Sequence, residues 1–169
     1  MNRRLFLGLG AYAASGTSDM VETARIQEEI PGHLVIRGAI DAALGGETIY
    51  ELPRLQQLPS VSFKTITPWT TGAHTFKGVN LKTLMAAVGA RGSIVRATAL
   101  NDYAITIDLS DSAASLAIVA YEEDGQPIRV RDKGPLWILF PFSDHPELLT
   151  DRVEGWSIWQ LDAIEVLAP

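Results

Sequence analysis

The sequence predicts a single mixed α+β domain that consists mostly of short strands with few helices. Three observations lead to this fold class. The chain of 169 residues has the length of one ordinary domain, and 47% of its residues are hydrophobic, enough to form a core. Short apolar runs separated by turn residues recur along most of the chain, as in a strand-rich domain. One segment has the clear spacing of a helix face.

The first half of the domain is predicted to contain three strands and one or two helical turns. The strands are expected at residues 34–40, 47–52 and 61–67, and the helical turns at 53–58. Gly45 and Gly46 mark a turn between the first two strands, which predicts a hairpin. Pro68 ends the third strand because it cannot donate a ladder hydrogen bond.

The clearest helix is predicted over residues 81–88. Its apolar residues are spaced at i, i+3, i+4 and i+7, which places them on one face: Leu81, Leu84, Met85 and Val88. Asn80 is a good residue to cap its start, and Gly89 is a good residue to end it.

The second half of the domain is predicted to contain six further strands. They are expected at residues 94–100, 103–109, 116–121, 127–130, 135–142 and 156–167. The almost wholly apolar run at 135–142 indicates a strand buried on both faces. In the closing strand the apolar positions change parity between Ile158 and Ile164, which predicts a bulge.

Composition excludes several classes of function. The chain has no cysteine, which excludes disulfides, thiolate zinc sites, iron–sulfur clusters and cysteine nucleophiles. Its net charge is −6 and no basic block interrupts the acidic balance, which argues against nucleic acid as a partner.

Residues 1–18 have the character of an export signal. Arg3 and Arg4 precede the apolar run 5–11, and the segment 11–13 has the small-x-small form of a cleavage site. We therefore expect a periplasmic protein, exported by a twin-arginine or Sec-type signal, with its folded domain at residues 33–167. The alternative is the N-terminal tail of a cytoplasmic protein. Cleavage after residue 13 would change the net charge from −6 to −8. No other segment reaches the roughly 18 apolar residues of a membrane span.

Common catalytic motifs are missing. The histidines His33, His74 and His145 are far apart and have no further ligand at metal-binding spacing. The sequence contains no G-x-S-x-G elbow, Walker loop or G-x-G-x-x-G fingerprint. Nucleophilic catalysis therefore has no support in the sequence.

Candidate ligand-binding residues gather in predicted loops at strand ends. In the segment 65–79, flat apolar faces stand beside polar edges, a combination that suits a planar heteroaromatic ligand. The candidates there are Thr67, Trp69, His74 and Phe76. A second group of candidates is Asn101, Asp102 and Tyr103.

A third group of candidates precedes the apolar run at 135–142. It consists of Arg131, Asp132 and Lys133, in which a carboxylate and a guanidinium form either a structural ion pair or ligand contacts. Tryptophans pack by default in the core, which is the expectation for Trp137 and Trp156.

Four motifs carry a resemblance to a known family. The segment 76–84 followed by 89–92 resembles the F-x-G-V-x-L core of the oxidoreductase molybdopterin-binding domain, which has the fold of sulfite oxidase. The resemblance extends to the motifs at 99–103, 131–137 and 157–161, and covers roughly residues 33–167. Within this superfamily the chain resembles a small, exported, single-domain branch. The resemblance implies a mostly β, sulfite oxidase-like fold.

The chain departs from the enzymes of this superfamily at their metal-binding residue. The enzymes carry a cysteine shortly before the F-x-G-V segment, where this sequence has 64–69 without cysteine. A threonine hydroxyl is a poor ligand for a soft-ligand, redox-active metal. We therefore expect a pterin as a ligand without molybdenum. The alternative is a molybdopterin-dependent oxidoreductase with a non-cysteine metal environment.

A pterin suits the candidate residues. Its fused ring can stack on Trp69 or Tyr103, and two of its ring donors can bind one carboxylate, either Asp102 or Asp132. Basic side chains of the third group can contact a carbonyl, a polyol or a phosphate of the ligand.

The small exported branch that this chain resembles includes pterin-binding regulators of membrane-bound diguanylate cyclases or phosphodiesterases. The resemblance therefore implies a non-catalytic sensor in cyclic-di-GMP signalling. Its partner would be the periplasmic region of a membrane protein with GGDEF or EAL domains. A third interpretation is an interaction module with an empty pocket.

Overall fold

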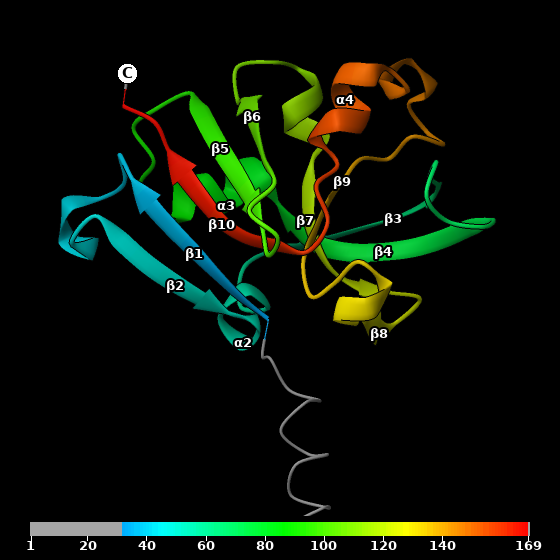
Figure 1. Ribbon diagram of the computed structural model, residues 1–169, viewed down its shortest axis with the longest axis horizontal. Helices are drawn as coiled ribbons and strands as arrows, with labels where there is room; N and C mark the ends of the chain where they lie inside the picture. The colour runs from blue at the N-terminus through cyan, green and yellow to red at the C-terminus, as the bar shows by residue number, and fades with distance from the viewer. Residues whose placement is uncertain (1–31, 169) are drawn as a thin grey trace, which may run out of the picture. The chain divides into compact units, whose positions relative to one another are not determined.

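Two β-sheets form the framework of residues 32–168, which the computed structural model describes (Figure 1). The first sheet contains, in spatial order, β2 (Glu47–Glu51), β1 (His33–Gly38), β10 (Leu161–Val166), β5 (Ile94–Ala99) and β6 (Ala104–Asp108). β1 pairs with β10 in parallel, and the other neighbours are antiparallel. The last strand of the described chain therefore lies in the middle of this sheet.

The second sheet is antiparallel throughout. It contains, in order, β3 (Ser60–Ile66), β4 (Ala73–Asn80), β7 (Ile118–Glu123) and β8 (Gln126–Pro127), and β9 (Trp137–Leu139) also pairs with β7. The loop between β3 and β4, residues 67–72, lies at one end of this sheet.

Three short α-helices and four 3-10 turns complete the described fold. The helices are α2 (Leu52–Leu55), α3 (Leu81–Ala87) and α4 (Asp151–Trp156). The 3-10 turns are η1 (Ala42–Leu44), η2 (Ala113–Leu116), η3 (Val130–Asp132) and η4 (Pro146–Leu148). The Asn80 side chain accepts hydrogen bonds from the backbone N–H groups of Lys82 and Thr83, which confirms it as the cap of α3. The predicted mixed α+β, mostly β fold class is also confirmed.

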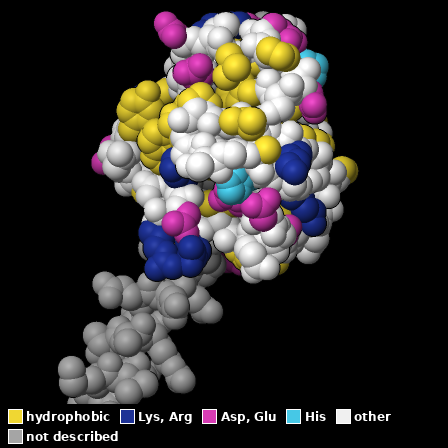
Figure 2. All heavy atoms as spheres, turned by 90° about the vertical axis from the view of Figure 1, so that its right-hand side faces the viewer, with side chains coloured by type: hydrophobic (Ala, Val, Ile, Leu, Met, Phe, Trp, Pro, Cys, Tyr) yellow, Lys and Arg dark blue, Asp and Glu magenta, His cyan; other side chains and the backbone are white. Residues whose placement is uncertain are grey.

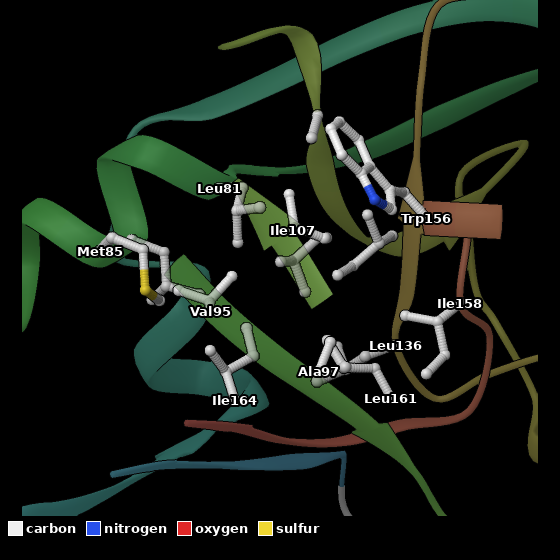
Figure 3. Packing of buried hydrophobic residues seen from close by; sticks show 14 of the residues in the cluster. Leu81, Met85, Val95, Ala97, Ile107, Leu136, Trp156, Ile158, Leu161 and Ile164 are labelled. Atoms are coloured by element: carbon white, nitrogen blue, oxygen red, sulfur yellow. The ribbon is translucent and has the colours of Figure 1, made fainter. Parts of the chain in front are cut away.

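The main core lies between α3 and the strands of the first sheet. Leu81 and Met85 on α3 point toward Val95 of β5 and Ile107 of β6, and all four side chains are buried (Figure 3). Burying one such side chain contributes about 2 kcal/mol. The apolar face read from the sequence is therefore the face that attaches α3 to the sheet.

The prediction for residues 73–80 was wrong, because this segment forms β4 instead of a loop. Phe76 is buried and its neighbour Thr75 is exposed, so part of the alternation of a strand is present. The alternation is broken at Lys77 and Gly78, where the register with β7 shifts. The bulge explains why the sequence pattern did not indicate a strand.

The closing strand is shorter than predicted. It begins at Leu161, and residues 151–156 form α4. The predicted bulge is confirmed, because the register with β5 shifts between Leu161 and Ala163. Trp156 and Trp137 are buried in the core, as expected. The run 135–142 is buried almost throughout, but only its centre, β9, forms a ladder.

Residues 1–18 lie outside the described residues, so the export signal stays a prediction. Within residues 32–168, none of the helices has the length and apolar character needed to cross a bilayer.

Candidate functional site

Two pockets lie on either side of the loop 67–72. The smaller one, here called the aromatic pocket, has a volume of about 360 Å³. It is lined by Trp69, Ala99, Asn101, Tyr103, Glu154, Gly155, Ser157, Ile158 and Trp159. The larger one, here called the charged cleft, has a volume of about 870 Å³. Its ionisable lining residues are His74, Glu123, Asp124, Arg129, Arg131, Asp132 and Lys133.

Trp69 lines the aromatic pocket and packs against Trp137, which lines the charged cleft. Its ring lies edge to face with Trp159 of the aromatic pocket and with Trp137 at the floor of the charged cleft, both at a centroid distance of 6.0 Å. The hydroxyl of Thr67 accepts a hydrogen bond from the Trp69 backbone N–H at 3.2 Å and lies 2.9 Å from the hydroxyl of Thr70. Aromatic packing on both sides and this hydroxyl bridge hold the tryptophan in place.

The turn between β5 and β6 forms the opposite wall of the aromatic pocket. The Asn101 side chain accepts a hydrogen bond from the Tyr103 N–H at 3.2 Å, and Asp102 adopts a left-handed φ of 65° that Asp tolerates. The Leu100 N–H donates to the Gln160 carbonyl at 2.9 Å, which brings this turn beside Trp159. Tyr103 lines the pocket and is 56% exposed.

Helix α4 supplies the polar side of the aromatic pocket. Its first turn is capped by the Thr150 hydroxyl, which accepts from the Val153 N–H at 3.3 Å. The Ser157 hydroxyl donates to the Val153 carbonyl at 3.2 Å. The partly exposed Glu154 carboxylate enters no ion pair within residues 32–168 and lines the pocket. Glu154 therefore offers a free acceptor beside two aromatic rings.

His74 is the most tightly held ionisable side chain of the charged cleft. Its Nδ1 lies 2.8 Å from Asp124 Oδ2 and 3.2 Å from Glu123 Oε1, and its Nε2 lies 2.9 Å from the Thr71 carbonyl oxygen. The hydrogen bond to Thr71, followed by the one to Asp124, raises the pKa of His74 above its ordinary value. The Thr75 N–H, followed by His74, lowers the pKa of the Asp124 carboxyl.

The third predicted group lies on the other side of the charged cleft. Arg129 Nε donates to Asp132 Oδ2 at 2.6 Å, whereas Arg131 Nε is 3.8 Å from the same oxygen. Lys133 Nζ lies 5.8 Å from the centre of the Trp137 ring, within range of a cation–π contact. Asp132 is thus in an ion pair, and its closest partner is Arg129, which the sequence analysis did not select.

The structure divides the predicted site residues into two groups. Trp69, Asn101 and Tyr103 line the aromatic pocket. His74, Arg131, Asp132 and Lys133 line the charged cleft. The remaining three, Thr67, Phe76 and Asp102, line neither pocket.

Two of these three residues have a structural explanation. Phe76 is fully buried and packs edge to face against Trp137 at 5.7 Å, so the prediction that its ring presents a face to a ligand was wrong. The buried Thr67 hydroxyl bonds within its own loop. Asp102 lies exposed in the turn between β5 and β6.

The segment 152–160 stands out in the sequence as a fourth cluster at a strand end, but Glu154, Ser157 and Trp159 were not selected from it as ligand-binding residues. All three are brought to the pocket by α4 and the segment after it, where a strand was predicted from residue 156. Thr150 followed by Asp151 was the available signal, because threonine caps helices and an acidic residue suits the first turn.

The stretch 64–69 does not fit a molybdenum centre. Its buried hydroxyls belong to Thr65 and Thr67, which are hard oxygen donors. Thr65 Oγ1 accepts from the Ser143 N–H at 3.0 Å, and Thr67 Oγ1 bridges to Thr70. Within residues 32–168, no group of three or more His, Asp or Glu side chains is arranged so that it could hold a metal ion. These residues supply neither the thiolate nor a replacement donor set.

Comparisons with known proteins support the fold. No protein-family model and no curated protein matches the sequence. The structure is similar to that of the sulfane dehydrogenase SoxCD from Paracoccus pantotrophus, with a TM-score of 0.59 and 12% sequence identity over 81% of this chain and 38% of that chain. At this identity the likeness concerns the fold alone, and this chain spans little more than a third of the matched one. The chain therefore has a mixed α+β, sulfite oxidase-like fold, distantly similar to that of molybdopterin oxidoreductases.

Proposed function

We propose that this chain is a non-catalytic pterin-binding protein whose ligand occupies the aromatic pocket. The observation that carries the proposal is the meeting of Trp69, Tyr103 and Trp159 with Glu154 in one pocket of about 360 Å³. Aromatic walls with a few convergent polar groups are typical of sites for small planar ligands.

Glu154 is the best carboxylate for the pterin edge. A pterin presents its 2-amino group and ring N–H as two parallel donors, which one carboxylate accepts as a charge-assisted pair. The sequence predicts this role for Asp102 or Asp132. Asp132 already accepts from Arg129, and Asp102 is exposed in its turn. The Asn101 side chain lies in the same lining and can reach the ring carbonyl of the ligand.

We propose a binding protein and not an enzyme, because the side chains at 64–69 are unsuited to bind the metal on which the enzymes of the superfamily depend. The hydroxyls of Thr65 and Thr67 already bond to protein groups. Pterin recognition needs flat faces and a carboxylate, and it needs no metal.

We also propose, from the resemblance, that the protein acts in the periplasm as a sensor for a membrane-bound diguanylate cyclase or phosphodiesterase. The exposed residues around the aromatic pocket support the proposal that a partner protein binds there. Three apolar side chains remain well exposed there or beside it: Leu100, Tyr103 and Trp159. A partner that covers them would also cover the bound ligand.

Titration of the purified protein with neopterin, followed by tryptophan fluorescence, tests the binding proposal. We expect saturable binding that Glu154→Gln weakens at least about tenfold, because a charge-assisted pair is lost. Glu47→Gln, an exposed glutamate on β2 in the other part of the first sheet, is the matched control and should bind as the wild type does. No saturable binding, or equal binding by both variants, would overturn the proposal.

Two further measurements separate the alternatives. Metal analysis of protein purified from its native host should show no stoichiometric molybdenum, and finding it would instead support the oxidoreductase. In a reconstituted complex, the cyclase or phosphodiesterase activity of the partner should respond to neopterin only when this chain is present. A stable complex whose activity ignores neopterin would contradict the sensor and favour the interaction module.

A further inference from the structure

His74 has an acceptor at each of its two ring nitrogens. Nδ1 faces the carboxylates of Asp124 and Glu123, and Nε2 faces the carbonyl oxygen of Thr71 at 2.9 Å. A carbonyl oxygen can only accept, so Nε2 must carry a proton to make its hydrogen bond. Nδ1 must also carry a proton to donate to a carboxylate. Both bonds exist together only when the ring is the doubly protonated imidazolium.

The other two histidines lack this arrangement. His145 Nδ1 lies 3.0 Å from Glu147, and His33 Nε2 lies 3.7 Å from Asp162. In both cases a carboxylate faces one nitrogen, and no hydrogen bond within residues 32–168 engages the other. Each histidine is therefore near a carboxylate, but His74 alone among them joins two separate backbone segments through both nitrogens.

The two segments joined by His74 are the β7–β8 turn and the loop 67–72. Asp124 is anchored to β4 in its own right, because its Oδ1 accepts from the Thr75 N–H at 2.8 Å and its N–H donates to the Thr75 carbonyl at 2.8 Å. Thr71 belongs to the loop 67–72, which carries Trp69. The first half of that loop is held by the Thr67 hydroxyl, and the His74–Thr71 bond holds its second half.

We propose that His74 is a positioning residue for the aromatic pocket, and that its protonation fixes the loop that carries Trp69. This inference deepens the proposed function, since it assigns a pH dependence to the same pocket. When His74 loses a proton, one ring nitrogen becomes an acceptor. That nitrogen then faces either the Thr71 carbonyl or a carboxylate, and one of the two bonds is lost.

The charged neighbours of His74 favour the imidazolium. The groups that face it or share its cleft are Glu123, Asp124, Asp132, Arg129, Arg131 and Lys133. Among the charged side chains of residues 32–168, only Glu123 and Asp124 lie within 4 Å of its ring nitrogens. The positive charge of Lys64 on β3 helps to lower the pKa of the Asp124 carboxyl. Figure 2 shows one face of the molecule, on which histidine, acidic and basic side chains are all exposed.

Three variants of the full chain test this inference: wild type, His74→Gln and the matched control His145→Gln. Neopterin affinity is measured between about pH 5.5 and about pH 8.5, across the range where histidines titrate. The wild type and His145→Gln should lose affinity about two- to tenfold at the higher pH, the effect of one ordinary hydrogen bond. His74→Gln should bind weakly and without this pH step. Ionisation of neopterin affects all three alike, so the difference between variants gives the result.

Measurements on the ligand-free protein keep this test separate from the proposed function. In the wild type, the His74 ring signals in NMR should titrate above the ordinary histidine pKa, and amide exchange at Thr71 and Gly72 should speed up over the same step. A His74 pKa at or below the ordinary value, or loop exchange unaffected by the titration, would overturn the inference. Failure of neopterin to bind would overturn the proposed function alone.

Discussion

The rings of Trp69 and Trp159 meet edge to face, with centroids 6.0 Å apart and planes inclined by 66°. Trp69 comes from the loop between β3 and β4 of the second sheet, and Trp159 comes from the segment that leads into β10 of the first. The pair therefore joins the two sheets at the aromatic pocket. Trp159 is 39% exposed, so part of its side chain is free to contact a ligand.

Replacement of Trp159 by alanine should reduce binding far more than stability. We expect neopterin affinity to fall at least about tenfold, because an aromatic wall of the pocket is lost. The free energy of unfolding should fall by about 1–2 kcal/mol, because Trp159 is 39% exposed and its loss removes edge-to-face pairs with Trp69 and Trp137. Fluorescence titration and urea denaturation measure the two effects. Trp156→Ala is the contrast: Trp156 is buried in the core, and its loss should cost about 3 kcal/mol or more.

Replacement of Gly155 by alanine should move stability and binding in opposite directions. Gly155 lies in α4, and a Cβ built there meets nothing within 4 Å. Alanine should stabilise the helix by about 0.5–1 kcal/mol. Because Gly155 also lines the aromatic pocket, the added methyl group should lower neopterin affinity. Unchanged affinity would place the ligand elsewhere.

Gly78→Ala is the same substitution at a site with no room for a methyl group. A Cβ at Gly78 would overlap the carbonyl oxygen of Val119 on β7, which cannot move without opening the sheet. We expect a loss of several kcal/mol or failure to fold, as for other clashes in a close-packed core. Circular dichroism during thermal unfolding distinguishes this variant from Gly155→Ala.

The His74–Asp124 pair should give the stability of the protein both an acid and an alkaline limit. The raised pKa of His74 means that its contribution is fully present below about pH 6.5 and is lost as pH rises through the folded-state pKa. The lowered pKa of Asp124 means that its contribution is present above about pH 3.9 and is lost as pH falls through the folded-state pKa. Urea midpoints measured against pH should lose the alkaline step in His74→Gln and keep it in His145→Gln.

Replacement of Thr65 by valine should destabilise the protein without direct loss of a ligand contact. Thr65 is fully buried, and its hydroxyl accepts from the Ser143 N–H at 3.0 Å. Valine has the same shape but would remove this hydrogen bond to the N–H of the exposed Ser143, at a cost of about 1 kcal/mol. Thr75→Val, an exposed threonine on β4, should change stability by no more than about 0.5 kcal/mol. Equal urea midpoints for the two variants would contradict this explanation.

Local patterns predicted the elements whose residues carry their own signals. Helix α3 has a capping side chain at Asn80 and an unbroken apolar face, so its start was correct and its end differed by one residue. The strands β1, β2, β5 and β6 are bounded by turn residues and were also predicted. In these segments local preference and tertiary packing favour the same structure.

The elements that were missed depend on distant parts of the chain. β4 contains Gly78 because the backbone of β7 approaches closely there, and this glycine hides the strand pattern. Helix α4 is too short for a periodic signal. The aromatic pocket arises where the β5–β6 turn meets Gln160, a contact that no local pattern encodes. Three of its lining residues were therefore predicted, while Glu154, Ser157 and Trp159 were not.

The central position of β10 has a consequence for synthesis of the protein. β10 lies between β1 and β5, so without it these two strands have no partner on their facing edges. The ribosome makes β10 after every other described element. Until residue 166 has emerged from the ribosome, the first sheet cannot close, and the nascent chain exposes the unpaired edges of β1 and β5.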